Sequence, residues 1–176
     1  MKSRLTLPTV ASMSDEQRCI FDDVVRTRGN ASGPFLAWLV SPGLAGPAQE
    51  LGAFCRYKTS LSLQESELLI LYVAAHHTCL GEQQIHEPIA NNAGLSDEVL
   101  IAIRTHEVPM LETPRLRLLA EIANELLDTK LIRPELYECA IQLLGEKTMV
   151  EVVGVLGYYA MVAYTLNAFS MRISDS

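Results

Sequence analysis

Three side chains able to move protons, Glu67, Glu82 and His86, lie within a stretch of twenty residues. Glu82 and His86 are four residues apart, so on a helix their side chains are neighbours, about 40° apart around the axis. A carboxylate beside an imidazole orients the ring and raises its basicity, which suits general acid–base catalysis. The same spacing also occurs in an ordinary surface Glu–His pair. A buried polar group nearby would favour the catalytic interpretation.

Glu67 is the candidate for that buried group. Leu63 precedes it by four residues, and Ile70 and Leu71 follow it by three and four, so it lies within an apolar stripe of a helix. A buried carboxylate must find a partner or shift its pKa upward. The alternatives are a glutamate held in a purely structural salt bridge and one that faces a subunit interface.

Glu67 and Cys79 can join one site only if the helix breaks between them or if the partner residue comes from another subunit. Glu67 and Cys79 are twelve residues apart, which is about 18 Å along one unbroken helix. We expect the break between Thr78 and Gly81, with Gly81 as the residue that permits it. His76 lies in the same stretch, and we expect it to complete a polar pocket with Glu67.

The same segment contains four possible metal ligands. His76, Cys79, Glu82 and His86 follow one another in steps of three, three and four, so they could share one face of a helix. A site on one helix still needs ligands from elsewhere, and the sequence has no matched second cluster. We therefore predict no metal.

Helical patterns run through almost the whole chain. Ser14 with Gln17 and Ser62 with Glu65 have the spacing of capping boxes, and Thr148 with Glu151 predicts a third box that opens the final helix. No segment alternates with period two over a useful length, and no hairpin signal occurs. The sequence predicts an all-α fold, a compact bundle of about seven to nine helices, in a single domain over 1–176.

The bulk properties exclude several classes of protein. The net charge is −7 and no basic patch occurs, so we expect no nucleic-acid partner. The apolar run 152–166 is interrupted by glycines and tyrosines and is shorter than a membrane span, so we expect no membrane partner. The four cysteines form no C-x-x-C pair, and residues 1–12 do not form a signal peptide, so we expect free thiols and a cytoplasmic location.

Glu67, Cys79 and His86 have the spacing of the Glu-x11-Cys-x2-Cys-x3-His pattern, and here the chain resembles the alkylhydroperoxidase D-like family. The second cysteine is replaced by Glu82. The carboxymuconolactone decarboxylase branch of that family is similar but carries a glutamate four residues before the histidine, as this chain does. The segments 86–90, 93–98 and 157–169 also resemble that branch. The resemblance implies a core over 33–169, with 1–32 as an N-terminal helical extension.

The resemblance implies a cofactor-independent acid–base enzyme that acts on a small organic acid or lactone as a decarboxylase does. His86 would transfer the proton, Glu82 would orient it, and Tyr158 or Tyr159 could donate a hydrogen bond. An arginine could hold the acidic substrate, and the candidates are Arg56, Arg104, Arg115 and Arg172. The resemblance also implies a homo-oligomer, either a trimer or a hexamer, with a dimer as the alternative.

Two other functions stay open. Peroxidase members resemble thiol relays in which a second cysteine resolves the first as a disulfide. With Glu82 in the resolving position, a single-cysteine peroxidase would need Cys79 and an external thiol; otherwise Cys79 simply lines a pocket. The remaining alternative is a helical binding or assembly protein without catalysis.

Overall fold

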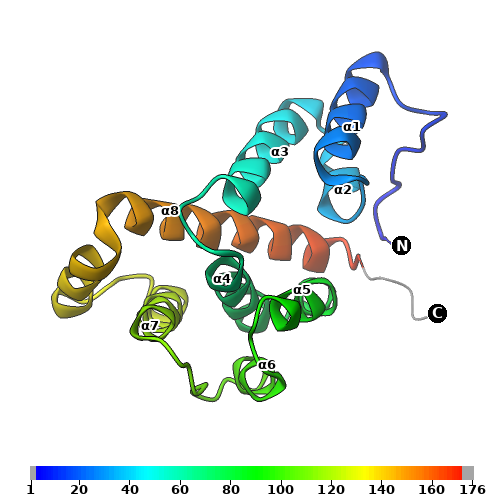
Figure 1. The fold of residues 1–176 in the computed structure, drawn as a ribbon. Coiled ribbons are helices and arrows are strands. Elements are labelled where there is room, and N and C mark those ends of the chain that lie inside the picture. Colours follow the sequence, from blue (N-terminus) through cyan, green and yellow to red (C-terminus); the bar gives the residue numbers. More distant parts are fainter. Residues whose placement is uncertain (1–2, 172–176) are drawn as a thin grey trace. The chain divides into compact units, whose positions relative to one another are not determined.

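The computed structural model describes residues 3–171, which form eight helices and no strand (Figure 1). The prediction of an all-helical fold is confirmed. The helices are α1 Asp15–Arg28, α2 Pro34–Trp38, α3 Pro42–Tyr57, α4 Leu63–His76, α5 Leu80–Asn92, α6 Asp97–Arg104, α7 Pro114–Thr129 and α8 Pro134–Ala168.

Two of the three predicted capping boxes are present. In α1 the Ser14 side chain accepts from the backbone N–H of Gln17, and the Gln17 side chain accepts in return from the Ser14 N–H. Ser62 and Glu65 make the same reciprocal pair at the start of α4. These bonds satisfy backbone donors that the first turn of a helix leaves without partners.

The third box, Thr148 with Glu151, was wrong. Both residues lie inside α8, whose backbone departs from helical geometry only at Gly145, with φ 80°. Their side chains instead bind Ser60. Its backbone N–H donates to the Glu151 carboxylate at 2.7 Å, and its hydroxyl lies 3.0 Å from the Thr148 hydroxyl. Ser60, which is distant in sequence, therefore binds the two side chains that would have formed the cap.

The described chain divides into two compact units. One contains the residues up to Lys58 and those from Tyr164 onward, and the other spans Thr59–Ala163. In the first unit α3 packs against α1 and α2, and the Trp38 indole N–H donates to the Thr165 hydroxyl at 2.9 Å.

In the second unit α4 packs against α5, α6 and α7 (Figure 1). Leu68, Leu69 and Ile70 of α4 are at most 2% exposed, so this helix is buried nearly all round. An ion pair between Glu65 of α4 and Arg115 of α7 joins two of the packed helices. The residues of the predicted site belong to this second unit.

The chain between α4 and α5 turns at Thr78. Thr78 has φ 49°, its N–H donates to Ala75 O at 2.9 Å, and the Cys79 N–H donates to Ala74 O at 2.8 Å. This pair of bonds is the Schellman motif, whose left-handed position is usually glycine. The break was predicted between Thr78 and Gly81. It lies at Thr78, whereas Gly81 is an ordinary residue inside α5.

By length and composition α8 could cross a membrane, and it is the only described helix that could. However, 61% of its apolar window is buried within the structure, as in the core helix of a globular protein.

Replacing Thr78 by glycine should raise the free energy of unfolding by about 0.5 to 1 kcal/mol. The left-handed conformation strains a β-branched residue by roughly 1–2 kcal/mol, and the greater freedom of glycine in the unfolded chain offsets part of the gain. Urea unfolding followed by circular dichroism measures the change.

Thr105→Gly is the matched control, because Thr105 is also an exposed threonine at a helix end but has φ −91°. That substitution should lower the free energy of unfolding by about 0.5 to 1 kcal/mol. Equal effects of the two substitutions would contradict the strain assigned to Thr78.

Candidate active site

His86 and Glu67 form the closest polar contact of the site. Nδ1 of His86 lies 2.6 Å from Oε2 of Glu67, and the two side chains are only 5% and 1% exposed. Glu67 is on α4 and His86 on α5, so the turn at Thr78 and the packing of the two helices bring them together. The sequence pointed to a buried Glu67 but did not identify His86 as its direct partner.

Glu82 lies at the other nitrogen of the same ring. Its Oε2 atom is 3.4 Å from His86 Nε2, and this pair is the i,i+4 pair of α5. The atom is buried and accepts no hydrogen bond from the described residues. The imidazole is therefore flanked by two carboxyl groups, with a strong hydrogen bond on the Glu67 side and a longer contact on the Glu82 side.

The flanking carboxyl groups change the acidity of His86. Burial alone would lower the pKa of the ring, but the contacts with Glu67 and Glu82 favour the charged form and raise the pKa to about 9. At neutral pH the ring is therefore an imidazolium that can give up a proton.

Among the described residues, no group of three or more His, Cys, Asp or Glu side chains is arranged to hold a metal ion.

Two tyrosines of α8 line the ring. The Tyr159 ring meets the His86 imidazole edge to face, with centroids 5.5 Å apart, and Tyr158 packs on Tyr159 in the same manner at 5.3 Å. Both tyrosines are 4% exposed. The sequence suggested that one of the two, Tyr158 or Tyr159, donates a hydrogen bond; the structure places the Tyr159 ring against His86 and the Tyr158 ring against Tyr159.

Cys79 occupies the N-cap position of α5 and is fully buried. Burial raises the pKa of its thiol, and the backbone N–H groups of Glu82 and Gly81 lower it only in part. The charge of Glu82 adds to the increase. Because its pKa is raised, the Cys79 thiol is held in its protonated, less nucleophilic form. All four cysteines are free thiols, as predicted.

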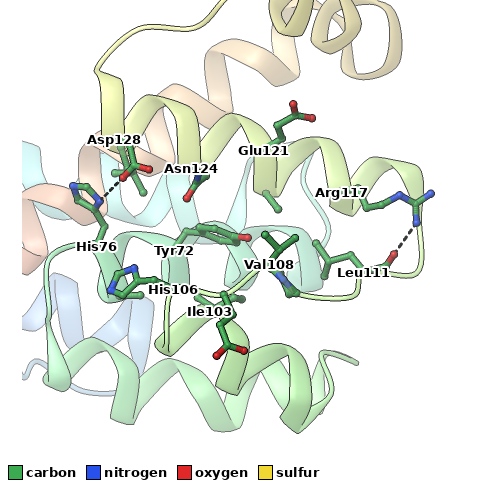
Figure 2. Close-up of a pocket in the computed structure, with 15 residues that line it drawn as sticks. Tyr72, His76, Ile103, His106, Val108, Leu111, Arg117, Glu121, Asn124 and Asp128 are labelled. Carbon is green, nitrogen blue, oxygen red and sulfur yellow. Dashed lines mark hydrogen bonds and ion pairs between the residues drawn. The ribbon is translucent and has the colours of Figure 1, made fainter.

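His76 does not join this group. It is nine residues after Glu67, and nine residues turn a helix by about two and a half turns, which places the two side chains on opposite faces of α4. His76 Nδ1 lies 3.4 Å from the Asp128 carboxylate on α7 (Figure 2). The structure therefore brings Glu67, Glu82 and His86 together and places His76 elsewhere.

Two of the candidate arginines, both in the unit that contains His86, pair with other carboxylates. Arg115 pairs with Glu65, and Arg104 lies 3.6 Å from Glu87. Arg56 belongs to the other unit, where its guanidinium lies over the Tyr57 ring, and Arg172 lies outside the described residues.

The raised pKa of His86 makes its contribution to stability dependent on pH. The folded value of about 9 exceeds the ordinary value of 6.5, so this contribution is fully present below pH 6.5 and is lost as pH rises through 9. We expect a loss of up to about 3 kcal/mol over that interval. Urea unfolding between pH 6 and pH 10 measures it, and His86→Gln should remove this dependence. An unchanged dependence in His86→Gln would assign it to other groups.

The segment that holds this site is similar in sequence to a known protein family. The model of the carboxymuconolactone decarboxylase family matches residues 42–125, which include Glu67, Cys79, Glu82 and His86. No curated protein matches this chain in sequence.

Solved structures resemble the chain over nearly its whole length. An uncharacterized peroxidase-related protein from Ralstonia eutropha JMP134, described as an alkylhydroperoxidase AhpD core, has a TM-score of 0.81 and 17% identity, covering 98% of this chain and 93% of that one. An uncharacterized peroxidase-related protein from Silicibacter sp. TM1040 has a TM-score of 0.78 and 15% identity, covering 96% and 90%. The debrominase Bmp8 in its apo form has a TM-score of 0.76 and 11% identity, covering 96% and 91%.

These identities are too low to carry an activity across, but the superpositions show a common fold. The segment matched by the family model contains the Glu67–His86 pair. The chain is thus similar to the carboxymuconolactone decarboxylase family over residues 42–125, and it shares its fold with the structure described as an alkylhydroperoxidase AhpD core.

Proposed function

We propose that the protein is a cofactor-independent enzyme that transfers a proton to a small organic acid or lactone, in the manner of a decarboxylase. The observation that carries the proposal is the position of His86 between two carboxyl groups, which raises its pKa to about 9. A histidine with that pKa is protonated at neutral pH and can act as a general acid. The family match to residues 42–125 supports the same chemistry.

The proposed step is the loss of CO₂ from a carbon conjugated with the carbonyl of the substrate. The bond between that carbon and its carboxylate breaks, the electron pair moves into an enolate, and CO₂ leaves. His86 Nε2 then gives its proton to the carbon of the enolate, which restores the carbonyl. Water reprotonates the imidazole for the next cycle.

Each neighbour of His86 has a separate part in this proposal. Glu67 fixes the ring and its protonation through the 2.6 Å contact at Nδ1, and it acts as a positioning residue. Glu82 lies on the side of Nε2, which is the nitrogen that would face the substrate. Glu67, Glu82 and His86 are at most 4% exposed, so a neighbouring segment must move to admit the substrate. A dry site strengthens the electrostatic contacts once the substrate is bound.

A single-cysteine peroxidase is the second candidate. The position of Cys79 at the N-terminus of α5 favours it, and the Ralstonia and Silicibacter proteins that share the fold are described as peroxidase-related. The buried thiol and its raised pKa weigh against it, because the thiolate is the nucleophile in such reactions.

Substitution of the site residues separates the two candidates. His86→Gln should lower turnover of a responsive carboxylactone by at least about 100-fold, because positioned proton transfer contributes on that order. Cys79→Ser should leave this turnover within a few-fold, and His106→Gln, at an exposed histidine, is the matched control. Release of CO₂ and consumption of peroxide with an external thiol are measured in parallel. Peroxide consumption lost in Cys79→Ser, or no turnover of any compound, would contradict the proposal.

The pH dependence of the rate gives an independent test. If protonated His86 is the acid, kcat falls as pH rises through about 9, whereas a Cys79 thiolate would make the rate increase toward alkaline pH. Glu67→Gln keeps the shape of the partner but removes its charge, so it should move the alkaline fall of kcat to lower pH. An unchanged pH profile in Glu67→Gln would exclude its positioning role.

We further propose that the chain forms a homo-oligomer through α8. Val150 and Val153 are 72% and 51% exposed, and Gly154 and Gly157 continue the same helical face with open space around them. Light scattering at micromolar concentration should give a mass above the 19.4 kDa of one chain. Val153→Arg should reduce that mass, and Glu138→Gln, on another exposed position of α8, should not. A monomer at that concentration would contradict the proposal.

A further inference from the structure

A cavity of about 610 Å³ lies on the side of α4 away from His86, between α4, α6, α7 and the link that joins α6 to α7 (Figure 2). Its volume falls in the range of small-molecule binding sites. Tyr72 and His76, one turn apart, line it from α4, and Asn124 and Asp128, also one turn apart, line it from α7. The proposed function does not use this cavity.

Two polar side chains of the cavity have no hydrogen-bond partner among the described residues. No hydrogen bond joins the Tyr72 hydroxyl or the Asn124 amide to another described residue. Burial raises the pKa of Tyr72 to about 12, so its hydroxyl stays neutral and can both donate and accept. Figure 2 shows the Tyr72 ring across the middle of the cavity, with Asn124 above it. These two groups can bind a polar group of a ligand.

The remaining surface of the cavity is mainly apolar. It is formed by aliphatic side chains of all four segments, namely Ala75, Ile103, Val108, Leu111, Ala120 and Leu127. Val108 is 94% exposed, and its neighbour in the link, Met110, is 92% exposed. An apolar ligand held against Tyr72 would remove part of this exposed surface from water.

The charges around the cavity disfavour an anion. Glu107, Glu121 and Asp128 are acidic, whereas Arg117 is the only arginine or lysine among the lining residues. The Arg117 guanidinium donates to the carbonyl oxygens of Leu111 and Glu112, and it points away from Tyr72 in Figure 2. Glu121 also points away and pairs with Arg133. Asp128 lines the cavity from α7, as Asn124 does, and its carboxylate pairs with His76.

From this geometry we infer that the cavity is a binding site for a neutral or cationic small molecule with an apolar ring and one hydrogen-bonding group. The ring would lie against Tyr72 and the aliphatic side chains, and its polar group would bond to the Tyr72 hydroxyl or the Asn124 amide. Such a ligand differs in charge from the organic acid proposed for the His86 site, and the inference stands independently of that function.

Three phenols that share one ring and carry para substituents of different charge test the inference. They are 4-methylphenol, which is neutral, tyramine, which is cationic, and 4-hydroxyphenylacetate, which is anionic. Titration calorimetry should show binding of the first two, with the anion at least about tenfold weaker than tyramine. Amide spectra should show shifts of the Asn124 side-chain resonance, identified by its absence in Asn124→Ala.

Matched variants locate the binding. Tyr72→Phe should weaken all three probes about fivefold or more, and Tyr137→Phe, at an exposed tyrosine, should weaken none. Asp128→Asn should weaken tyramine about fivefold and leave 4-methylphenol unchanged, with Glu138→Gln as the control for loss of one negative charge. His86→Gln should bind all probes as the native protein does.

Three outcomes would overturn the inference. One is no binding of 4-methylphenol or tyramine at millimolar concentration to the folded protein. Another is tightest binding of the anion. The third is binding that is lost in His86→Gln but kept in both Tyr72→Phe and Asn124→Ala, which would place the probes at the other site.

Discussion

A carboxylate cannot be buried in a protein interior without a partner, and in this chain that constraint falls on Glu67. It is fully enclosed on α4, the most deeply buried helix of its unit, and its partner is the imidazole of His86 on α5. The contact with Glu67 favours the charged form of the imidazole, and either group alone would pay a large desolvation penalty in that position. The turn at Thr78 and the packing of α4 on α5 bring this pair together, and the high pKa of His86 depends on it.

The charge arrangement around His86 also decides which chemistry the neighbouring residues can carry out. The carboxyl groups that keep the imidazole protonated act in the opposite direction on a thiol. Glu82, which contributes to the raised pKa of His86, raises that of Cys79 as well. A cysteine at position 82 would resolve the oxidised Cys79 in a thiol relay. A glutamate at position 82 instead favours proton transfer by His86 and disfavours the thiolate form of Cys79. A single residue type at position 82 therefore changes the balance between the two proposed activities.

Much of the local structure could be predicted from the sequence, because it depends on neighbouring residues. The boxes at Ser14 and Ser62, and the burial of Glu67 within its apolar stripe, follow from spacing alone. The errors came from contacts between residues distant in the chain. Thr148 and Glu151 have the spacing of a cap but bind Ser60, and His76 has the type and proximity of a site residue but faces Asp128. The helix break fell on Thr78 because a Schellman turn can force a left-handed threonine, which residue preferences do not predict.

The two halves of the candidate site differ in how firmly they are held. Glu67 stands on a helix with a complete capping box and packed faces, so this segment should open only with global unfolding. His86 stands on α5, whose N-cap residue makes no side-chain hydrogen bond and whose interior contains Pro88, which removes a backbone bond. Local unfolding is therefore less costly for α5 than for α4. The site can thus admit a molecule by fluctuations of the helix that carries the acid, while the helix that sets its protonation stays in place.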